Sequence, residues 1–249
     1  METAGTTTRK KQSIGELVAN DWRNAEVFKK YGIDFCCGGK KTVEEACAQS
    51  AIDPSFVESE LKKLEETAVA GTQDFKNWEL DFLIDYIVNN HHKYVVEAIP
   101  FLEELSLKVV RVHGNSHSEL IEIDSQIRQL TDELSMHMHK EELILFPYIK
   151  QLVGARRNGQ TLGPPPFGTI ANPISMMEIE HVAAGGAMEA IEELSNHFNP
   201  PADACTSYRV LFAKLQEFQM DLHQHVHLEN NILFPKALKL EEESTKFLK

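Results

Sequence analysis

Two stretches of the sequence repeat one another, HMHKEELILFP at residues 137–147 and HVHLENNILFP at residues 225–235. Both follow the pattern H-x-H-x-E-x-x-I-L-F-P, with apolar residues at helical rather than alternating spacing. A repeat of this kind indicates two helices that do the same job at two places in one fold. Because the pattern combines imidazoles with a carboxylate, the two helices are expected to place these polar groups in the interior of a helical protein.

The register of each repeat follows from helix geometry. Residues four apart lie on one face of an α-helix, whereas residues two apart lie on nearly opposite faces. His137 should therefore point with Glu141, and His225 with Glu229. These two pairs are the first candidate metal ligands.

The flanking residues of each repeat support this register. Leu145 and Leu233 continue the same stripes, as expected for faces that turn inward. The middle histidines, His139 and His227, point elsewhere and are expected at the surface.

Imidazole and carboxylate together suit a buried site for iron. Imidazole binds iron and zinc, and a carboxylate is a harder ligand that can join two cations. Glutamates between two cations would also offset buried positive charge, which is costly when it is unpaired. Manganese and zinc remain alternatives at this stage, because affinity alone does not select iron.

Histidines elsewhere in the chain supply the remaining candidates. His181 lies on a third helical segment, and His91 shares a stripe with Ile84, Ile87 and Val88, which favours it over His92. A continuous helix would place His113 about 33 Å from His91. Both can reach one centre only if the chain turns back between them, and Pro100 is the place where such a break is expected.

The second part of the chain is predicted to be an all-α bundle of four long helices. A Gly- and Pro-rich loop follows residue 153, Asn199-Pro200-Pro201 makes a second break, and strand patterns are nearly absent. Metal sites in such bundles are built from inward side chains on facing helices. The helices are expected near residues 78–107, 118–153, 173–198 and 204–240, within a domain over 78–249.

The first part is predicted to be a small helical domain over residues 13–70. Ser13 with Glu16 and Thr42 with Glu45 have the spacing of capping boxes. Gly32 fits a helix C′ position, and Asp53-Pro54 fits an N-cap followed by proline at the first helical position. Residues 1–12 are expected to be disordered, and 67–73 to form a linker.

Composition excludes several classes of function. The formal net charge of −13 argues against nucleic acid, which requires a basic face. No apolar run approaches the roughly 18 residues that span a bilayer, so no membrane partner is expected. The first twelve residues lack the apolar core of a signal peptide, which favours a cytoplasmic location.

The four cysteines do not form two spaced C-x-x-C pairs, so a structural zinc site is not expected. Cys36 and Cys37 are adjacent, and a disulfide between neighbours is strained and labile, which suits a redox or transfer role. Thiolates are also soft ligands for iron. Two small buried thiols beside a glycine turn are the alternative interpretation. Cys47 and Cys205 are expected in the core.

Several of these motifs together resemble a known family. Residues 31–40, YGIDFCCGGK, resemble the N-terminal signature of the di-iron iron–sulfur cluster repair proteins (repair of iron centres). The two histidine–glutamate repeats and Met177-Glu178-x-x-His181 resemble that family's hemerythrin-like domain. The resemblance covers nearly the whole chain after residue 12. It implies a small domain that carries the vicinal cysteines and a hemerythrin-like four-helix bundle that holds two iron ions with a carboxylate or oxo bridge.

The resemblance also implies a ligand set and a function. The function would be repair of, or iron supply to, iron–sulfur client proteins damaged by nitric oxide or oxidative stress. Cys36 and Cys37 would be functional thiols. The protein would be cytoplasmic and able to form a homodimer. His92, next to His91, leaves the first position open. The implied metal ligands are His91, His113, His137, Glu141, His181, His225 and Glu229.

Two other classes of function remain open. A di-iron enzyme that reduces nitric oxide or consumes peroxide needs an open metal position for its small substrate. A carrier or sensor of oxygen or nitric oxide needs no cysteine-containing domain, which ranks it below the other two. A ferritin-like oxidase is disfavoured, because only one Glu-x-x-His motif, Glu178-x-x-His181, is present.

Overall fold

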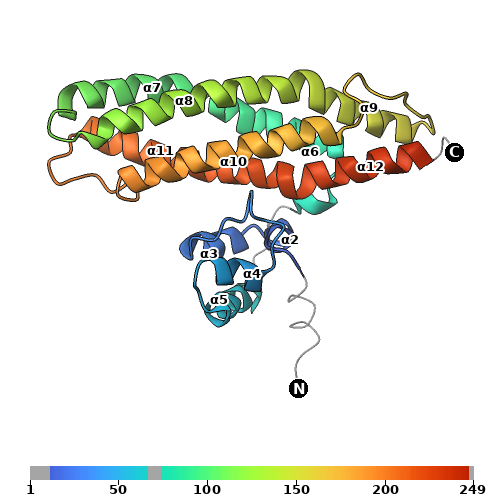
Figure 1. Ribbon diagram of the computed structural model, residues 1–249, viewed down its shortest axis with the longest axis horizontal. Helices are drawn as coiled ribbons and strands as arrows, with labels where there is room; N and C mark the ends of the chain where they lie inside the picture. Colours follow the sequence, from blue (N-terminus) through green and yellow to red (C-terminus); the bar gives the residue numbers. More distant parts are fainter. Residues whose placement is uncertain (1–11, 67–73, 247–249) are drawn as a thin grey trace.

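The computed structural model describes residues 12–66 and 74–246, and the regular elements of this part of the chain are helices, apart from one isolated bridge between Ser13 and Thr42. The predicted all-α class is confirmed. Helices form a small N-terminal unit beneath the middle of a long bundle (Figure 1). The expected linker over 67–73 and, apart from Gln12, the expected disordered segment 1–12 lie outside the described residues.

The N-terminal unit consists of short helices with strong local start and stop signals. Both predicted capping boxes form, with backbone N–H groups of Glu16 and Glu45 donating to Ser13 Oγ (3.2 Å) and Thr42 Oγ1 (3.3 Å). Gly32 follows the second helix with φ +63°, the left-handed conformation that glycine adopts without strain. The helices are α2 (Ile14–Asn20), α3 (Asn24–Lys30), α4 (Val43–Gln49) and α5 (Pro54–Glu66).

The bundle is built from four long helical rods, three of which contain a π-helical segment between two α-helices. A short 3₁₀ turn, η1 (Phe75–Asn77), precedes it. The first rod comprises α6 (Leu80–Tyr86), η2 (Ile87–His92) and α7 (Lys93–His113). The others are α8 (Glu119–Lys140), η3 (Glu141–Leu145) and α9 (Phe146–Arg157); α10 (Ala171–Leu194); and α11 (Thr206–Leu228), η4 (Glu229–Leu233) and α12 (Phe234–Lys246).

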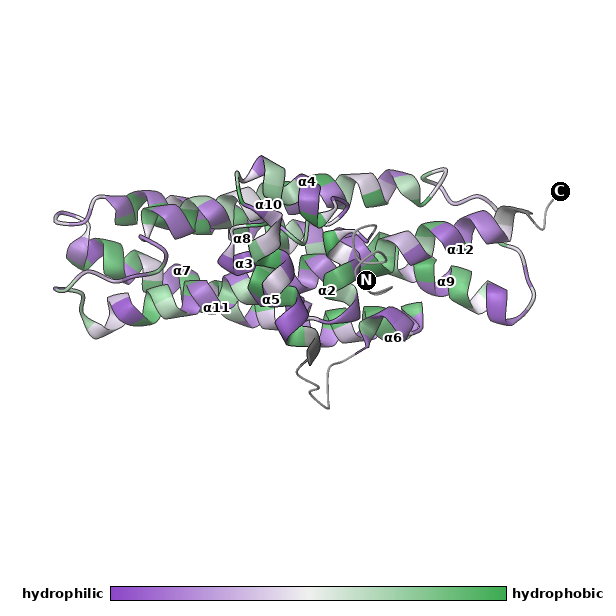
Figure 2. Ribbon diagram, turned by 90° about the horizontal axis from the view of Figure 1, so that it is seen from below, coloured by the Kyte–Doolittle hydropathy of each residue, from purple (hydrophilic) through white to green (hydrophobic). Residues whose placement is uncertain are grey.

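Apolar stripes at helical spacing bury the inner face of each rod. On α8, for example, Leu120, Ile123, Ile127, Leu130 and Leu134 are all at most 3% exposed. At about 1.5–3 kcal/mol for each fully buried side chain, such stripes supply most of the energy that packs the helices together. Seen from below, apolar and polar residues alternate along each rod (Figure 2).

The first rod does not turn back at Pro100, so this expectation was wrong. Helix α7 continues through Pro100 to His113. A proline removes one backbone donor, yet the packed stripe through Val95, Ala98 and Leu102 keeps the helix intact. His113 therefore lies at the far end of the bundle from η2.

Three of the rods contain a π-helical turn at the same level of the bundle: η2, η3 and η4. A π-turn widens the helix by one residue and shifts the faces of the side chains that follow. Such turns are rare in ordinary helices and occur frequently at functional sites. Here each turn contains or begins with a histidine or glutamate singled out in the sequence.

One asparagine of the second repeat makes hydrogen bonds from the bundle to the docked N-terminal unit. Asn231 Nδ2 donates to the carbonyl oxygens of Cys36 (2.9 Å) and Phe35 (3.4 Å). A Cβ at Gly15 or Gly39 would lie only 2.2–2.3 Å from Asn231 Oδ1, so both positions require glycine for this close approach. Outside this contact, Lys40 forms an ion pair with Glu178 of α10.

His227 belongs to this docking surface, and its expected surface position was wrong. It is 1% exposed, and its ring packs against Trp22 and Phe35 at centroid distances of 5.6 and 6.1 Å. Burial lowers the pKa of His227 to about 4, so the ring is neutral at ordinary pH. The sequence register correctly turned His227 away from His225, but the covering domain could not be read from that register. His139 is exposed, as expected.

Within the described segments, no helix combines the length and the apolar character needed to cross a membrane.

The close packing at Gly39 generates a stability prediction. Gly39→Ala places a methyl group against Asn231 Oδ1 and the Phe35 carbonyl, and overpacking of this kind costs about 1–3 kcal/mol. The matched control is Gly186→Ala, in the exposed interior of α10 with open space around its Cβ, which should stabilise the helix by about 0.5–1 kcal/mol. Thermal unfolding monitored by circular dichroism should separate the two variants in opposite directions. Equal midpoints would contradict the proposed tight contact.

Candidate metal centre

A polar layer divides the interior of the bundle into two apolar clusters. One cluster includes Leu134 and Met138 of α8, and the other begins on the same rod at Leu145. The same division occurs on α11, between Val226 and Leu228. Between the clusters lie six side chains that are at most 2% exposed: His92, His137, Glu141, His181, His225 and Glu229.

These six side chains form two adjacent groups that share both glutamates. In the first group His92 Nε2 lies 3.1 Å from His225 Nε2 and 3.3 Å from Glu141 Oε2, and His225 Nε2 lies 3.1 Å from Glu229 Oε1. Ligands at right angles around a metal, each at 2.0–2.2 Å, lie about 3 Å apart. The first group has that spacing.

The second group repeats the arrangement with the other two histidines. His181 Nε2 lies 3.0 Å from His137 Nε2 and 3.1 Å from Glu229 Oε2, and His137 Nε2 lies 3.4 Å from Glu141 Oε2. Glu229 thus presents Oε1 to one group and Oε2 to the other. This arrangement suits a carboxylate that is shared between two cation-binding groups.

The glutamates lack enough hydrogen-bond donors to account for their burial. Among the described residues, no hydrogen bond of acceptable geometry reaches either oxygen of Glu141 or Oε2 of Glu229, although imidazole nitrogens stand beside them at ion-pair distance. Buried carboxylates without donors are very costly unless cations neutralise them. The donor set of four imidazoles and two carboxylates fits divalent or trivalent metal ions of borderline hardness.

The electrostatics of the metal-free cluster also favour a site for positive charge. Burial alone would lower the pKa of His92 and His137, but the neighbouring carboxylates outweigh it and raise these values to about 10 and about 9. Burial would raise the pKa of Glu229, but His225, His181 and His92 hold it well below its usual range. Protons on the imidazoles therefore occupy the electrostatic role that a metal would take.

Three of the four histidines are oriented through Nδ1 by a polar partner. His92 Nδ1 lies 2.7 Å from Glu142 Oε1, His137 Nδ1 lies 2.9 Å from Glu180 Oε2, and His181 Nδ1 lies 2.9 Å from Asn230 Oδ1. An Nδ1–H that donates to an oxygen fixes the tautomer and leaves Nε2 free to bind a metal. Two of these partners could have been predicted from the sequence, because Glu142 and Asn230 each directly follow the glutamate of a repeat.

The preference for His91 over His92 requires correction. Both rings are buried, but His92 joins the cluster, whereas His91 Nδ1 lies 2.8 Å from Asp221 and its ring stacks on His225 at 5.6 Å. The π-turn η2 causes the difference. It adds one residue to the turn, so the face that continues the α-helical stripe through Ile84 is occupied by His92 instead of His91. His91 supports the cluster from outside.

His113 is not part of the cluster either. Its Nε2 lies 3.1 Å from Cys205 Sγ at the far end of α7. The assignment required a chain reversal at Pro100 that does not occur. Cys205 is exposed, contrary to the expected core position, whereas Cys47 is fully buried as expected.

The vicinal cysteines lie in a tight loop beside the second repeat, and both are free thiols. Asp34 organises this loop: Oδ1 accepts from the backbone N–H of Cys36 and Cys37 (both 3.0 Å), and Oδ2 accepts from Gly38 (2.8 Å). Cys37 is half-buried. Hydrogen bonding to Cys37, burial and the charge of Asp34 together raise the pKa of Cys36 well above its usual value. Asp34, Cys36 and Cys37 place three potential ligand atoms close together.

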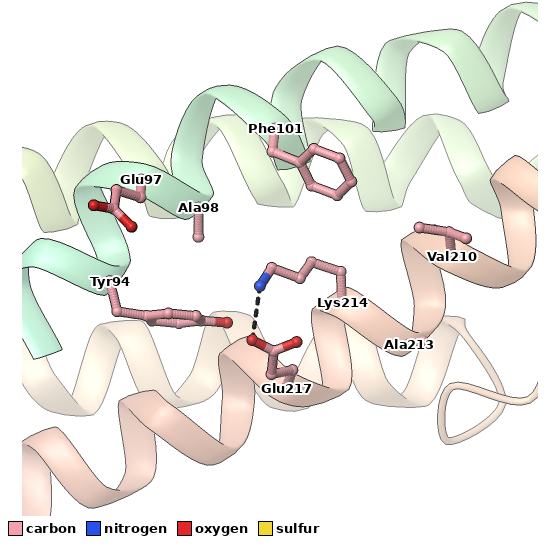
Figure 3. A pocket seen from close by; sticks show the side chains of 8 residues that line it. All are labelled: Tyr94, Glu97, Ala98, Phe101, Val210, Ala213, Lys214 and Glu217. Atoms are coloured by element: carbon pink, nitrogen blue, oxygen red, sulfur yellow. Dashed lines mark hydrogen bonds and ion pairs between the residues drawn. The ribbon is translucent and has the colours of Figure 1, made fainter. Parts of the chain in front are cut away.

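A surface groove between α7 and α11 lies apart from this chemistry. It has a volume of about 480 Å³ and contains a Lys214–Glu217 ion pair beside the Tyr94 ring (Figure 3). None of its lining residues is a histidine, a cysteine or a glutamate of the cluster. The groove therefore adds nothing to the metal-binding chemistry.

The raised pKa values generate a proton-release prediction. Near pH 7 the metal-free protein holds protons on His92 and His137, and a metal must displace them, so binding should release about two protons and strengthen as the pH rises toward 9–10. Calorimetric titration with ferrous iron in buffers of different ionisation enthalpy measures this number. Binding without proton release would contradict the assignment of these imidazoles as ligands.

The chain is similar to two domain families and to proteins that are named for the repair of iron–sulfur clusters. Residues 10–65 match ScdA_N, a domain of unknown function, and residues 83–237 match the hemerythrin HHE cation binding domain. The iron-sulfur cluster repair protein YtfE of Escherichia coli O81 (strain ED1a) is 39% identical over 91% of this chain and 96% of its own length. Its counterpart in Escherichia fergusonii is 38% identical over the same shares. The chain therefore belongs to the iron-sulfur cluster repair proteins that join an ScdA_N domain to a hemerythrin HHE cation-binding domain.

Proposed function

We propose that this protein holds two iron ions between its six buried ligands and supplies iron to iron–sulfur clusters damaged by nitric oxide or oxidative stress. The observation that carries the proposal is the pair of four-residue groups with shared glutamates, since one carboxylate set between two imidazole pairs suits two cations. The names of the relatives supply the repair role.

The ligand set favours iron over zinc. Structural zinc sites are typically closed tetrahedra rich in thiolate, whereas these groups contain only imidazole and carboxylate. Each group offers four protein atoms, which leaves further positions on a six-coordinate ion for exchange. Iron in such a site supplies a reservoir of exchangeable ions that can also change oxidation state.

The two parts of the chain would divide the work. The bundle stores the ions, because its glutamates are sealed between apolar clusters. The N-terminal unit places the thiols of Cys36 and Cys37 at the edge of this store, where soft ligands can receive iron and pass it to a client protein. Asp34 holds the loop in shape for this transfer.

Reactivation of a damaged enzyme tests the proposal. The iron-loaded protein is incubated anaerobically with an iron–sulfur dehydratase that nitric oxide has inactivated, and recovered activity is followed. We expect recovery with the wild-type protein and loss of more than about tenfold with Glu141→Ala, which removes a shared ligand.

The matched control is Glu133→Ala, an exposed glutamate of α8 in the same rod, which should leave recovery unchanged. Ferrous iron with sulfide serves as the positive control for the client enzyme. Failure of the loaded protein where this mixture succeeds would overturn the proposal. Catalytic conversion of nitric oxide to nitrous oxide without any recovery would assign the centre to the competing reductase function.

The remaining expectations stay predictions. They concern the cytoplasmic location, homodimer formation and the identity of the iron–sulfur client proteins.

A further inference from the structure

The side chain of Asn230 touches the metal cluster on one side and the cysteine loop on the other. Its Oδ1 lies 2.9 Å from His181 Nδ1, and its Nδ2 points to Cys37 Sγ at 4.0 Å. Asn230 is buried, with 6% of its surface exposed. A single amide thus connects a ligand of the centre to a thiol of the other domain.

The repeat shows that this position is specialised. In the first repeat the equivalent residue is Glu142, which supports His92 in the way that Asn230 supports His181. A carboxylate can accept from a histidine but has nothing to donate to a second group. An amide does both, and the second copy faces the cysteine loop whereas the first does not. The asymmetry therefore coincides with the docked domain.

The two cysteines are not equivalent with respect to this contact. The Cys36 thiol is buried and donates to Asp34 Oδ1 at 3.2 Å. Cys37 is more exposed and is the thiol that Asn230 reaches. Of the pair, Cys37 is placed to receive an ion from the centre.

We propose, on the basis of the proposed function above, that Asn230 is a positioning residue that links the metal-binding ring of His181 to Cys37, so that iron leaves the centre on the His181 side and meets Cys37 rather than Cys36. When Nε2 of His181 binds metal, its Nδ1–H must donate to Oδ1 of Asn230. The amide nitrogen is then turned toward Cys37, where it holds the sulfur in place.

Transfer along this route needs no change in oxidation state. His181 Nε2 would lose ferrous iron as it leaves the centre, and Cys37 Sγ would bind it once it has reached the cysteine loop. The thiol gives up its proton and the imidazole takes one up, so that charge and protons balance.

A double-mutant cycle on iron release tests the link. The ferrous-loaded full-length protein is mixed anaerobically with a chromogenic chelator, and the release rate is measured for the wild type, Asn230→Ala, Cys37→Ser and the double variant. We expect Cys37→Ser to slow release about tenfold in the wild-type background and less than about twofold in the Asn230→Ala background. Cys36→Ser should have the smaller effect.

Two further variants guard against a merely structural role. Asn230→Asp keeps an acceptor for His181 but removes the donor to Cys37, so iron release from this variant should lose its dependence on Cys37. Glu142→Gln is the matched change in the first repeat, and its effect should simply multiply with that of Cys37→Ser.

Alkylation gives an independent readout. Both cysteines lie in one tryptic peptide, residues 31–40, and fragment masses resolve them. Iron loading should change the alkylation rate of Cys37 in the wild type and leave it unchanged in Asn230→Asp. Equal effects of Cys37→Ser in the wild-type and Asn230→Ala backgrounds, or a larger effect of Cys36→Ser, would overturn the link alone. A wild-type protein that takes up no iron would instead overturn the proposed function.

Discussion

The burial of two glutamates in the middle of an apolar bundle is the constraint on which the rest of the structure depends. Glu141 and Glu229 are fully buried, and the described residues give three of their four oxygens no well-formed hydrogen bond. Carboxylates in this position destabilise a helical core unless positive charge surrounds them. His92 and His137 meet that requirement with protons, and in the proposed function four imidazoles from four rods meet it together with metal ions.

The constraint explains the irregular parts of otherwise regular helices. The π-turns η2, η3 and η4 all lie at the level of the glutamates, because bringing histidines from several helices to within about 3 Å of one another requires more freedom than an ideal helix allows. Away from this level, regular apolar stripes stabilise the bundle. The polar centre and the stable scaffold are thus separated along the helix axes.

The second repeat combines two functions that the first does not. Its Glu229 belongs to the centre, whereas the next two residues, Asn230 and Asn231, face the N-terminal unit. Gly15 and Gly39 give Asn231 the space to reach the backbone of the cysteine loop. Docking and metal binding therefore share one helical turn. This turn places the thiols of the cysteine loop beside the proposed metal centre, and, among the described residues, the first repeat takes no part in the docking.

The sequence by itself determined the helical class, the capping boxes and the pairing of His137 with Glu141 and of His225 with Glu229, because these depend on local spacing along one helix. The structure brings these residues together with His181, but it replaces His91 with His92 and leaves out His113. Those choices were decided by a π-turn and by the unbroken course of α7, neither of which has a distinctive local pattern. The burial of His227 likewise depended on a domain distant in the chain, since only tertiary packing determines which polar face is covered.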